Sequence, residues 1–214
     1  MNFDELISFL EKKLKGVLPG EKAHSLMQPR LPDGTSLRLK NSKPPKEGGV
    51  LILLYNEGGE AFFPLIQRPE YEGVHSGQMA LPGGKAEEED DDLIMTALRE
   101  TREEIGVSEE KIKVIGSLSR FFVAASNYMV EPVIGVIDHK PDFVPDPREV
   151  SDIITPSINE LINPALRKEK ELVVKNGYKL QSPYFDLSDR VVWGATAMML
   201  SELVTILNEE FNSQ

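Results

Sequence analysis

Three glutamates, Glu100, Glu103 and Glu104, lie within five positions of one another in the segment ALRETREEIGV. On a helix each residue advances about 100° around the axis, so the three carboxylates fall within an arc of about 100°. A mostly apolar stripe runs beside them and predicts the face that packs on a core. Its members are Ile94, Ala97, Leu98, Thr101 and Ile105. The acids therefore border a buried surface, where burial disfavours the charged form of a carboxylate unless a cation compensates.

Two interpretations of this group of acids follow from the residues alone. Hard divalent cations such as Mg²⁺ prefer oxygen ligands, so the group suits a metal site. Glutamate-rich helices are also common as solvated surface helices, and Arg99 can pair with Glu103 four residues later. The surrounding elements and the sequence just before the helix are needed to decide between a metal site and a solvated surface.

The composition narrows the class of protein. With 214 residues, of which 40% are hydrophobic and 28% charged, the chain has the make-up of a soluble globular domain. It has no cysteine, no apolar run long enough to cross a bilayer and no secretion signal at its start. A net charge of −11 argues against nonspecific binding to nucleic acid. We therefore expect a cytoplasmic protein that binds neither membrane nor nucleic acid.

Hydrophobic patterns predict one folded unit with a helix at each end. The first helix is amphipathic, with Phe3, Ile7, Leu10 and Leu14 on one side. The elements expected after it are an irregular connection at 18–49, a hairpin at 49–68, a short strand at 78–85, a helix at 90–105 that ends at Gly106, strands at 111–124 and 128–138, a Pro-rich loop at 139–150, a short helix at 158–168, a hairpin around Asn176-Gly177 at 170–187, and a closing helix at 192–211.

This order of elements predicts an α+β fold, in which a mixed β-sheet is sandwiched between α-helices. We expect a single domain over residues 1–214, with an N-terminal helix and irregular extension at 1–45 and a catalytic core at about 46–210. The first helix packs either on its own domain or on a second copy of the chain, which leaves a homodimer open.

Residues 82–107, PGGKAEEEDDDLIMTALRETREEIGV, resemble the Nudix box, the signature of the Nudix hydrolases. The usual pattern is Gly, five residues, Glu, seven residues, Arg-Glu, an apolar residue, any residue, Glu-Glu, any residue, Gly and an apolar residue. The matching positions are Gly84, Arg99, Glu100, Glu103, Glu104 and Gly106. Thr101 stands where an aliphatic residue is usual, and six residues rather than five separate Gly84 from Asp91.

The longer spacing, together with Asp90 ahead of the segment ALRE, resembles the pattern of one subgroup, the coenzyme A pyrophosphatases. Their second signature, just upstream, is roughly Leu-Leu-Thr-x-Arg-Ser, three residues, Arg, three residues, Gly and Phe-Pro-Gly-Gly. The matching positions here are Arg68, Gly77, Pro82, Gly83 and Gly84. The departures are Ile66, Pro69, Gly73 and Leu81. Gly73 matters most, because it removes a cation that could hold a phosphate of the nucleotide.

The resemblance implies an enzyme that cleaves a diphosphate linked to another moiety by attack of water on phosphorus. It also implies Mg²⁺ or Mn²⁺ as cofactor, since such ions neutralise charge and lower the pKa of bound water. The implied metal ligands are Glu100, Glu103, Glu104 and the backbone carbonyl of Gly84. Arg99 is expected to orient a glutamate by bidentate pairing.

Glu149 is a further catalytic candidate, in the place where many Nudix enzymes carry an additional loop acid. It would take a proton from the attacking water or bind a metal. The alternatives are that Glu149 is a plain surface glutamate and that Glu100 is the base.

The expected substrate contacts are Arg68, Gly83, Gly84 and Tyr128. Arg68 could either contact a phosphate of the substrate or pair with an acidic side chain inside the protein. Tyr128 and Trp193 suit an adenine ring, although buried aromatics usually only pack. His75 lies near the upstream motif, where a lone histidine is more often a surface or hydrogen-bonded residue.

The substrate that this resemblance favours is coenzyme A or a thioester of it. The products would be phosphopantetheine, or its acylated form, and adenosine 3′,5′-bisphosphate. Another nucleoside diphosphate conjugate, such as ADP-ribose or a nucleotide sugar, is the alternative substrate. A non-catalytic nucleotide-binding regulator is the alternative function, although such proteins usually lack one of the metal-binding glutamates.

Overall fold

The computed structural model describes residues 2–35, 43–70, 72, 75–173, 177 and 179–211, with the backbone alone at 210 and 211. Two positions named above, Gly73 in the upstream motif and Asn176 in the expected hairpin turn, lie outside the described residues.

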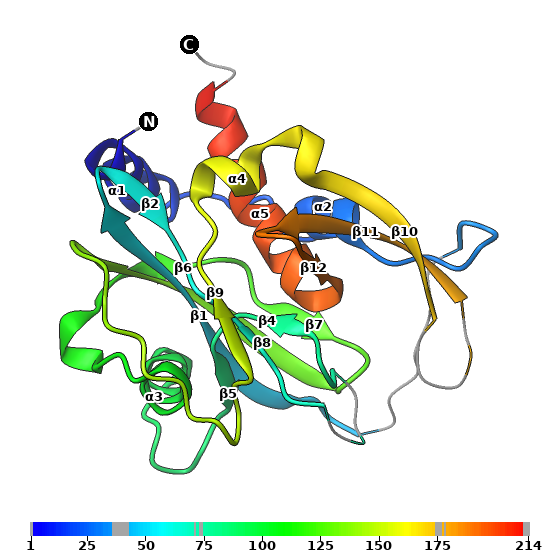
Figure 1. Cartoon of the computed structure of the whole chain (residues 1–214), viewed down its shortest axis with the longest axis horizontal. Helices are drawn as coiled ribbons and strands as arrows, with labels where there is room; N and C mark the ends of the chain where they lie inside the picture. The colour runs from blue at the N-terminus through cyan, green and yellow to red at the C-terminus, as the bar shows by residue number, and fades with distance from the viewer. Residues whose placement is uncertain are drawn as a thin grey trace.

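The centre of the molecule is a six-stranded mixed sheet built on two long strands, β1 (Lys46–Glu57) and β8 (Tyr128–Ile137), which run parallel to each other (Figure 1). The other strands pair antiparallel to these two: β2 (Glu60–Phe62) and β5 (Gly83–Lys85) with β1, and β6 (Lys113–Ser117) and β7 (Phe121–Val123) with β8. Residues 51–55 of β1 are fully buried. Such a continuous apolar run is typical of a strand that is covered on both faces.

Two small sheets flank the central one. The first contains β10 (Arg167–Val173), β11 (Lys179–Leu187) and β12 (Arg190–Trp193). The second contains β4 (Met79–Ala80), β3 (Leu65–Gln67) and β9 (Asp152–Ile154). The pairing of β9 with β3 fixes the end of the Pro-rich loop, which carries Glu149.

Helices cover both faces of the central sheet (Figure 1). On one face α3 (Leu93–Ile105) packs in a cluster with Leu51, Leu53 and Val133. On the other face lie α1 (Phe3–Lys13) and α5 (Gly194–Phe211). The shorter helices are α2 (Glu21–His24), α4 (Ile158–Ile162) and 3-10 turns at Ser25–Met27, Glu109–Lys111 and Pro164–Leu166. The expected α+β fold, with a mixed sheet between helices, is confirmed.

Several expected boundaries change in the structure. The helix expected from residue 90 begins at Leu93, because Asp92 is its N-cap and accepts a 2.9 Å hydrogen bond from the Met95 N–H. Of the 49–68 hairpin, β1 and β2 pair as expected around Gly58 and Gly59, but residues 65–67 leave to join β9. β12 was missed, because it continues directly into α5.

The N-terminal helix and the irregular extension expected at 1–45 both contribute buried residues to the core. Phe3, Leu6 and Leu10 of α1 are buried in the same cluster as the apolar residues of α5. The irregular connection also contains α2 and a 3-10 turn, and Met27 of that turn is fully buried.

A buried carboxylate fastens this segment to the rest of the fold. Glu202 of α5 has no exposed surface. Its Oε1 accepts hydrogen bonds from the Gly20 N–H at 2.8 Å and the Ser119 hydroxyl at 2.7 Å. Its Oε2 accepts from the Ser119 N–H at 3.1 Å and lies 3.0 Å from His24 Nε2. We call these four residues the Glu202 cluster.

Candidate active site

Helix α3 lies close to the central sheet at Gly49. An ideal Cβ atom on Gly49 of β1 would come within 2.2 Å of the Leu93 carbonyl oxygen, so only glycine fits there. The helix ends at Gly106, whose φ of 74° is the left-handed conformation that glycine adopts at helix ends. This placement turns the acidic edge of α3 toward Gly83 and Gly84 of β5.

Glu104 is the most deeply buried of the three glutamates and is only 2% exposed. Its Oε2 accepts a 2.8 Å hydrogen bond from the Gly83 N–H. Burial raises the pKa of Glu104 to about 8, although the Gly83 hydrogen bond and the positive charge of Arg68 oppose this rise. A carboxyl group with this pKa is mostly protonated at neutral pH, and a nearby cation would favour its charged form.

Glu100 lies directly over Gly84. An ideal Cβ on Gly84 would sit 2.5 Å from the carboxylate atoms of Glu100, so a side chain at position 84 would displace that carboxylate. Burial also raises the pKa of Glu100, and the neighbouring Arg99 partly offsets the effect. The two adjacent glycines of β5 therefore position both carboxylates: Gly83 donates a hydrogen bond to Glu104, and Gly84 leaves room for Glu100.

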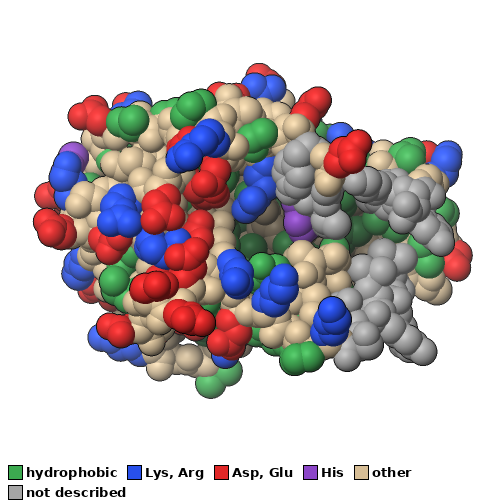
Figure 2. Space-filling view, turned by 90° about the horizontal axis from the view of Figure 1, so that it is seen from below, with side chains coloured by type: hydrophobic (Ala, Val, Ile, Leu, Met, Phe, Trp, Pro, Cys, Tyr) green, Lys and Arg blue, Asp and Glu red, His purple; other side chains and the backbone are tan. Residues whose placement is uncertain are grey.

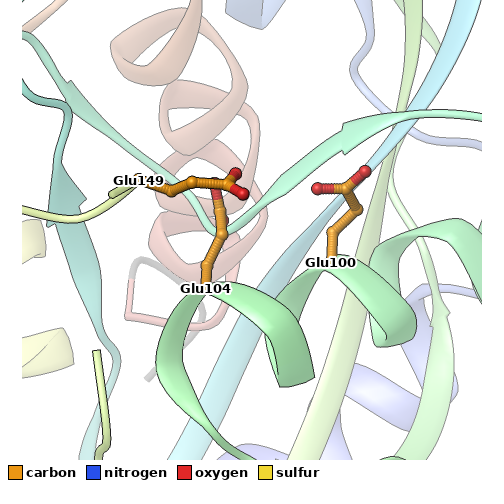
Figure 3. A group of neighbouring side chains, drawn as sticks. All are labelled: Glu100, Glu104 and Glu149. Carbon is orange, nitrogen blue, oxygen red and sulfur yellow. The ribbon is translucent and has the colours of Figure 1, made fainter. Parts of the chain in front are cut away.

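Glu149 completes a group of three carboxylates. Glu100, Glu104 and Glu149 each offer one oxygen atom, and these atoms lie within 4.8 Å of one another. Figure 3 shows Glu100 and Glu104 rising from α3 and Glu149 reaching in from the loop, so that its carboxylate lies near that of Glu104. We call these three residues the carboxylate group.

The loop that carries Glu149 is attached to the last turn of α3. The Val144 N–H donates to the Ile105 carbonyl at 2.9 Å, and the Asp146 N–H donates to the Glu104 carbonyl at 3.0 Å. These bonds satisfy carbonyl groups that a helix end leaves without partners. At the far end of the loop, the Ser151 N–H donates to the Gln67 carbonyl at 2.9 Å. Glu149 is thus held between α3 and β3.

Glu103 lies outside the carboxylate group. Its side chain is 46% exposed and pairs with Arg99 at 3.1 Å and with Arg102 at 3.2 Å. The structure therefore places it beside the site expected from the sequence, on the outer edge of α3.

Arg99 does not make its bidentate pair with a glutamate, as the sequence suggested. Its Nε and Nη2 donate to the two oxygens of Asp90, both at 2.9 Å. Its Nη1 donates to Glu100 and Glu103, both at 3.1 Å. Arg99 therefore links Asp90 to the carboxylate group through a single bond to Glu100.

Asp90 is the residue that sequence reasoning missed. It belongs to the acidic run at 87–92, to which the sequence analysis assigned no role in the site, yet its side chain is only 5% exposed. It also accepts hydrogen bonds from the Glu87 N–H and the Thr96 hydroxyl. The hydrogen bonds from Arg99 hold the pKa of Asp90 well below its usual range, despite burial. The feature of the sequence that could have identified Asp90 was its position ahead of the segment ALRE, as in the coenzyme A pyrophosphatases.

The residues expected to contact the substrate each have partners of their own in the structure. Arg68 Nη2 donates to the Gly83 carbonyl at 3.4 Å, next to Glu104. Tyr128 begins β8 opposite Lys46, whose Nζ is 5.7 Å from the centre of the tyrosine ring. His75 bonds to Gln78, its near neighbour in the chain. Trp193 ends β12, in register with Tyr184 of β11.

Figure 2 shows the charge on the face that carries α3. Asp and Glu side chains gather over α3 and the loop before it, and Lys and Arg side chains border a hollow beside them. Chemically, three clustered carboxylate oxygens fit the ligand preference of a hard divalent cation. The basic border fits an anionic ligand next to that cation.

Comparison with known proteins finds a matching family and several relatives. The family model described as the NUDIX domain matches residues 45–176. The protein named "Nudix hydrolase 15, mitochondrial" from Arabidopsis thaliana is 35% identical over 172 residues, which cover 77% of this chain and 60% of that protein. The Nudix hydrolase NudL of Pectobacterium atrosepticum is 31% identical over 136 residues, which cover 63% of this chain and 69% of that protein.

Among solved structures, the MutT protein from Methanosarcina mazei has a TM-score of 0.49 at 17% identity, covering 79% of this chain and 99% of its own. The chain spans less than two thirds of the length of the Arabidopsis relative. These names specify no coenzyme A subgroup, and that assignment stays a prediction. Within the described residues, none of the helices combines the length and apolar character needed to cross a bilayer.

Proposed function

Because this chain belongs to the Nudix domain family, we propose that it is a metal-dependent hydrolase of a diphosphate bond in a nucleoside diphosphate derivative. The observation that carries this proposal is the carboxylate group, whose oxygens lie within 4.8 Å of one another. Anionic groups at this spacing repel one another unless a cation lies between them. When bound, Mg²⁺ or Mn²⁺ would offset the charge of the diphosphate and lower the pKa of water.

The carboxylates have separate roles in this proposal. Glu100 and Glu104 hold the ion, with the backbone carbonyl of Gly84 as a further ligand. Glu103, on the outer edge, holds a second ion directly or through water. Glu149 is the exposed member of the carboxylate group, where water can reach it, so we assign it the role of accepting the proton of the attacking water. Since its oxygen belongs to the same group, we also assign it a share in binding the ion.

The substrate is anionic, and the basic border of the hollow supports this choice (Figure 2). Arg68, beside Gly83, is placed to contact a phosphate. Tyr128 and Lys46 form a cation–π pair at the start of β8 and β1, where the ring can stack on a base.

The finer proposal is that the substrate is coenzyme A or an acyl-coenzyme A. The matches to the upstream signature and the six-residue spacing before Asp91 support it. Since Gly73 removes an expected cation, ADP-ribose or a nucleotide sugar is the second candidate. A nucleotide-binding regulator is the third, although the chain retains all three glutamates of the Nudix box.

A substrate panel tests these candidates directly. The purified protein is incubated with coenzyme A, ADP-ribose or a nucleotide sugar, with Mg²⁺ or Mn²⁺, and the products are separated by liquid chromatography. We expect cleavage of coenzyme A into phosphopantetheine and adenosine 3′,5′-bisphosphate. Cleavage of a nucleotide sugar with coenzyme A left intact would reject the finer proposal. Tight binding of nucleotides without any hydrolysis would reject the hydrolase and favour the regulator.

Matched glutamate variants assign the activity to this site. Glu104→Gln should abolish most of the hydrolysis, and Glu103→Gln should reduce it less. Glu110→Gln is the control, because Glu110 is exposed and follows α3 in the chain. Equal rates in the Glu104 and Glu110 variants would reject the role proposed for Glu104.

We also propose a cytoplasmic location, as the sequence predicted, although the Arabidopsis relative carries the word mitochondrial in its name. The apolar side of α1 is buried in the core of its own chain, which favours packing within one copy over a homodimer through this helix. Light scattering on the purified protein would show whether it forms dimers by another surface.

A further inference from the structure

Glu149 is connected to Glu104 through two backbone hydrogen bonds of Asp146. The Glu104 carbonyl accepts from the Asp146 N–H at 3.0 Å, and the Asp146 carbonyl accepts from the Glu149 N–H at 3.0 Å. The side chains of the two glutamates also lie near each other, because the oxygens of the carboxylate group are within 4.8 Å of one another (Figure 3). The position of Glu149 relative to Glu104 therefore depends on the geometry of one intervening turn.

That turn has Asp146 as its first residue, followed by Pro147, Arg148 and Glu149. Asp at the first position and Pro at the second are the residues that a type I turn favours, since proline fixes φ at the second position. The Asp146 side chain closes the turn from inside, because its Oδ1 accepts a 2.9 Å hydrogen bond from the Arg148 N–H. Its backbone carbonyl also accepts from the Val150 N–H at 2.8 Å, and Val150 is buried.

Asp146 also forms an ion pair with the Arg148 side chain, at 2.6 Å. This pair contributes little to the turn, because the Arg148 side chain is 84% exposed and water screens its charge. What the turn requires of residue 146 is an acceptor oxygen on a short side chain, which asparagine also supplies.

We propose that Asp146 is a positioning residue for Glu149: its side-chain oxygen holds the turn that brings the Glu149 carboxylate near that of Glu104. This proposal rests on the function proposed above, because it gives Glu149 a place in the reaction. Asp146 itself touches neither substrate nor metal in this scheme. Its effect passes through the Arg148 N–H and the backbone of the turn.

The test compares Asp146→Ala, Asp146→Asn and Arg148→Ala with Glu149→Gln. The alanine variant loses the acceptor, the asparagine variant keeps it without the charge, and the Arg148 variant removes only the ion pair. Losses of about 10-fold to 100-fold are typical when a residue that orients a metal ligand or catalytic group is changed. We expect Asp146→Ala to lower kcat by about this factor with KM little changed. The Asp146→Asn and Arg148→Ala variants should stay close to wild type.

The double variant Asp146→Ala with Glu149→Gln should be no slower than Glu149→Gln alone, because both changes remove the same carboxylate from the site. Additive losses would overturn the proposal. So would an Asp146→Ala variant as fast as wild type, or an Asp146→Asn variant as slow as the alanine variant. Circular dichroism of each variant establishes that it is folded.

Mn²⁺ affinity, measured by electron paramagnetic resonance, gives a readout that does not depend on turnover. Asp146→Ala and Glu149→Gln should weaken Mn²⁺ binding by the same factor, and Asp146→Asn should restore it. If the wild type hydrolyses nothing on the panel but shows this pattern, the proposed function fails and the role of Asp146 stands. If Glu149→Gln alone weakens Mn²⁺ binding, the role of Asp146 fails.

Discussion

Replacing Glu202 by glutamine should lower the melting temperature far more than the same change at Glu209, on the same helix. Glu202 is fully buried, and its two oxygens face four groups of the Glu202 cluster. The Glu209 side chain is 54% exposed and pairs with Lys13. The two positions therefore test one chemical change in a buried and an exposed setting.

The magnitude follows from the hydrogen bonds. In glutamine one oxygen becomes an amide NH₂, which cannot accept, so two of the four neighbours of residue 202 lose their acceptor. Each buried donor left without a partner costs about 1–3 kcal/mol. Since the Ser119 hydroxyl can turn and accept from the amide, we expect a loss of about 2–4 kcal/mol in the free energy of unfolding. For a chain of this size that lowers the melting temperature by about 4–16 °C.

The pH dependence gives a second measurement. Burial raises the pKa of Glu202, but hydrogen bonds from His24, Ser119 and Gly20 outweigh burial and hold the pKa below its usual value of 4.5. A lowered pKa in the folded state means that this carboxylate stabilises the fold above pH 4.5, and that the contribution is lost as pH falls through the folded value. The difference in stability between wild type and Glu202→Gln should therefore narrow in acid.

Thermal unfolding followed by circular dichroism, at pH 7 and at pH 4, measures both effects. An exposed ion pair contributes about 0–1 kcal/mol, so Glu209→Gln should change the melting temperature by only a few degrees. If Glu202→Gln unfolds at the same temperature as Glu209→Gln at pH 7, the reasoning from buried hydrogen bonds is wrong.

Three further predictions concern the carboxylate group. Asp90→Asn should lower kcat by about 10-fold to 100-fold, because Arg99 loses a charged partner. Glu88→Gln, at an exposed position of the same acidic run, should leave kcat unchanged, and steady-state kinetics of the two variants measures the difference. Gly84→Ala should weaken Mn²⁺ binding in a titration, since its Cβ would displace the Glu100 carboxylate; unchanged affinity would contradict the described packing. Chelation by EDTA should stop hydrolysis, and added Mg²⁺ or Mn²⁺ should restore it; activity that survives chelation would reject a metal-dependent reaction.

The sequence by itself determined the local parts of the site. The apolar stripe and Gly106 specified helix α3, and the spacing of Glu100 and Glu104 placed both on one side of it. The turn at Gly58-Gly59 specified the β1–β2 hairpin. These features depend on residues a few positions apart, whose interactions are set by helix and turn geometry.

The tertiary structure alone decided which distant groups meet. It placed Glu149 in the carboxylate group, turned Glu103 outward and gave Arg99 an aspartate as its bidentate partner. It also joined His24 to Glu202, 178 positions away in the chain. Such contacts depend on how a loop docks on a helix end and how a helix packs on a sheet. Those arrangements are set by the shapes of surfaces that come together only on folding, so residue spacing along the chain does not encode them directly.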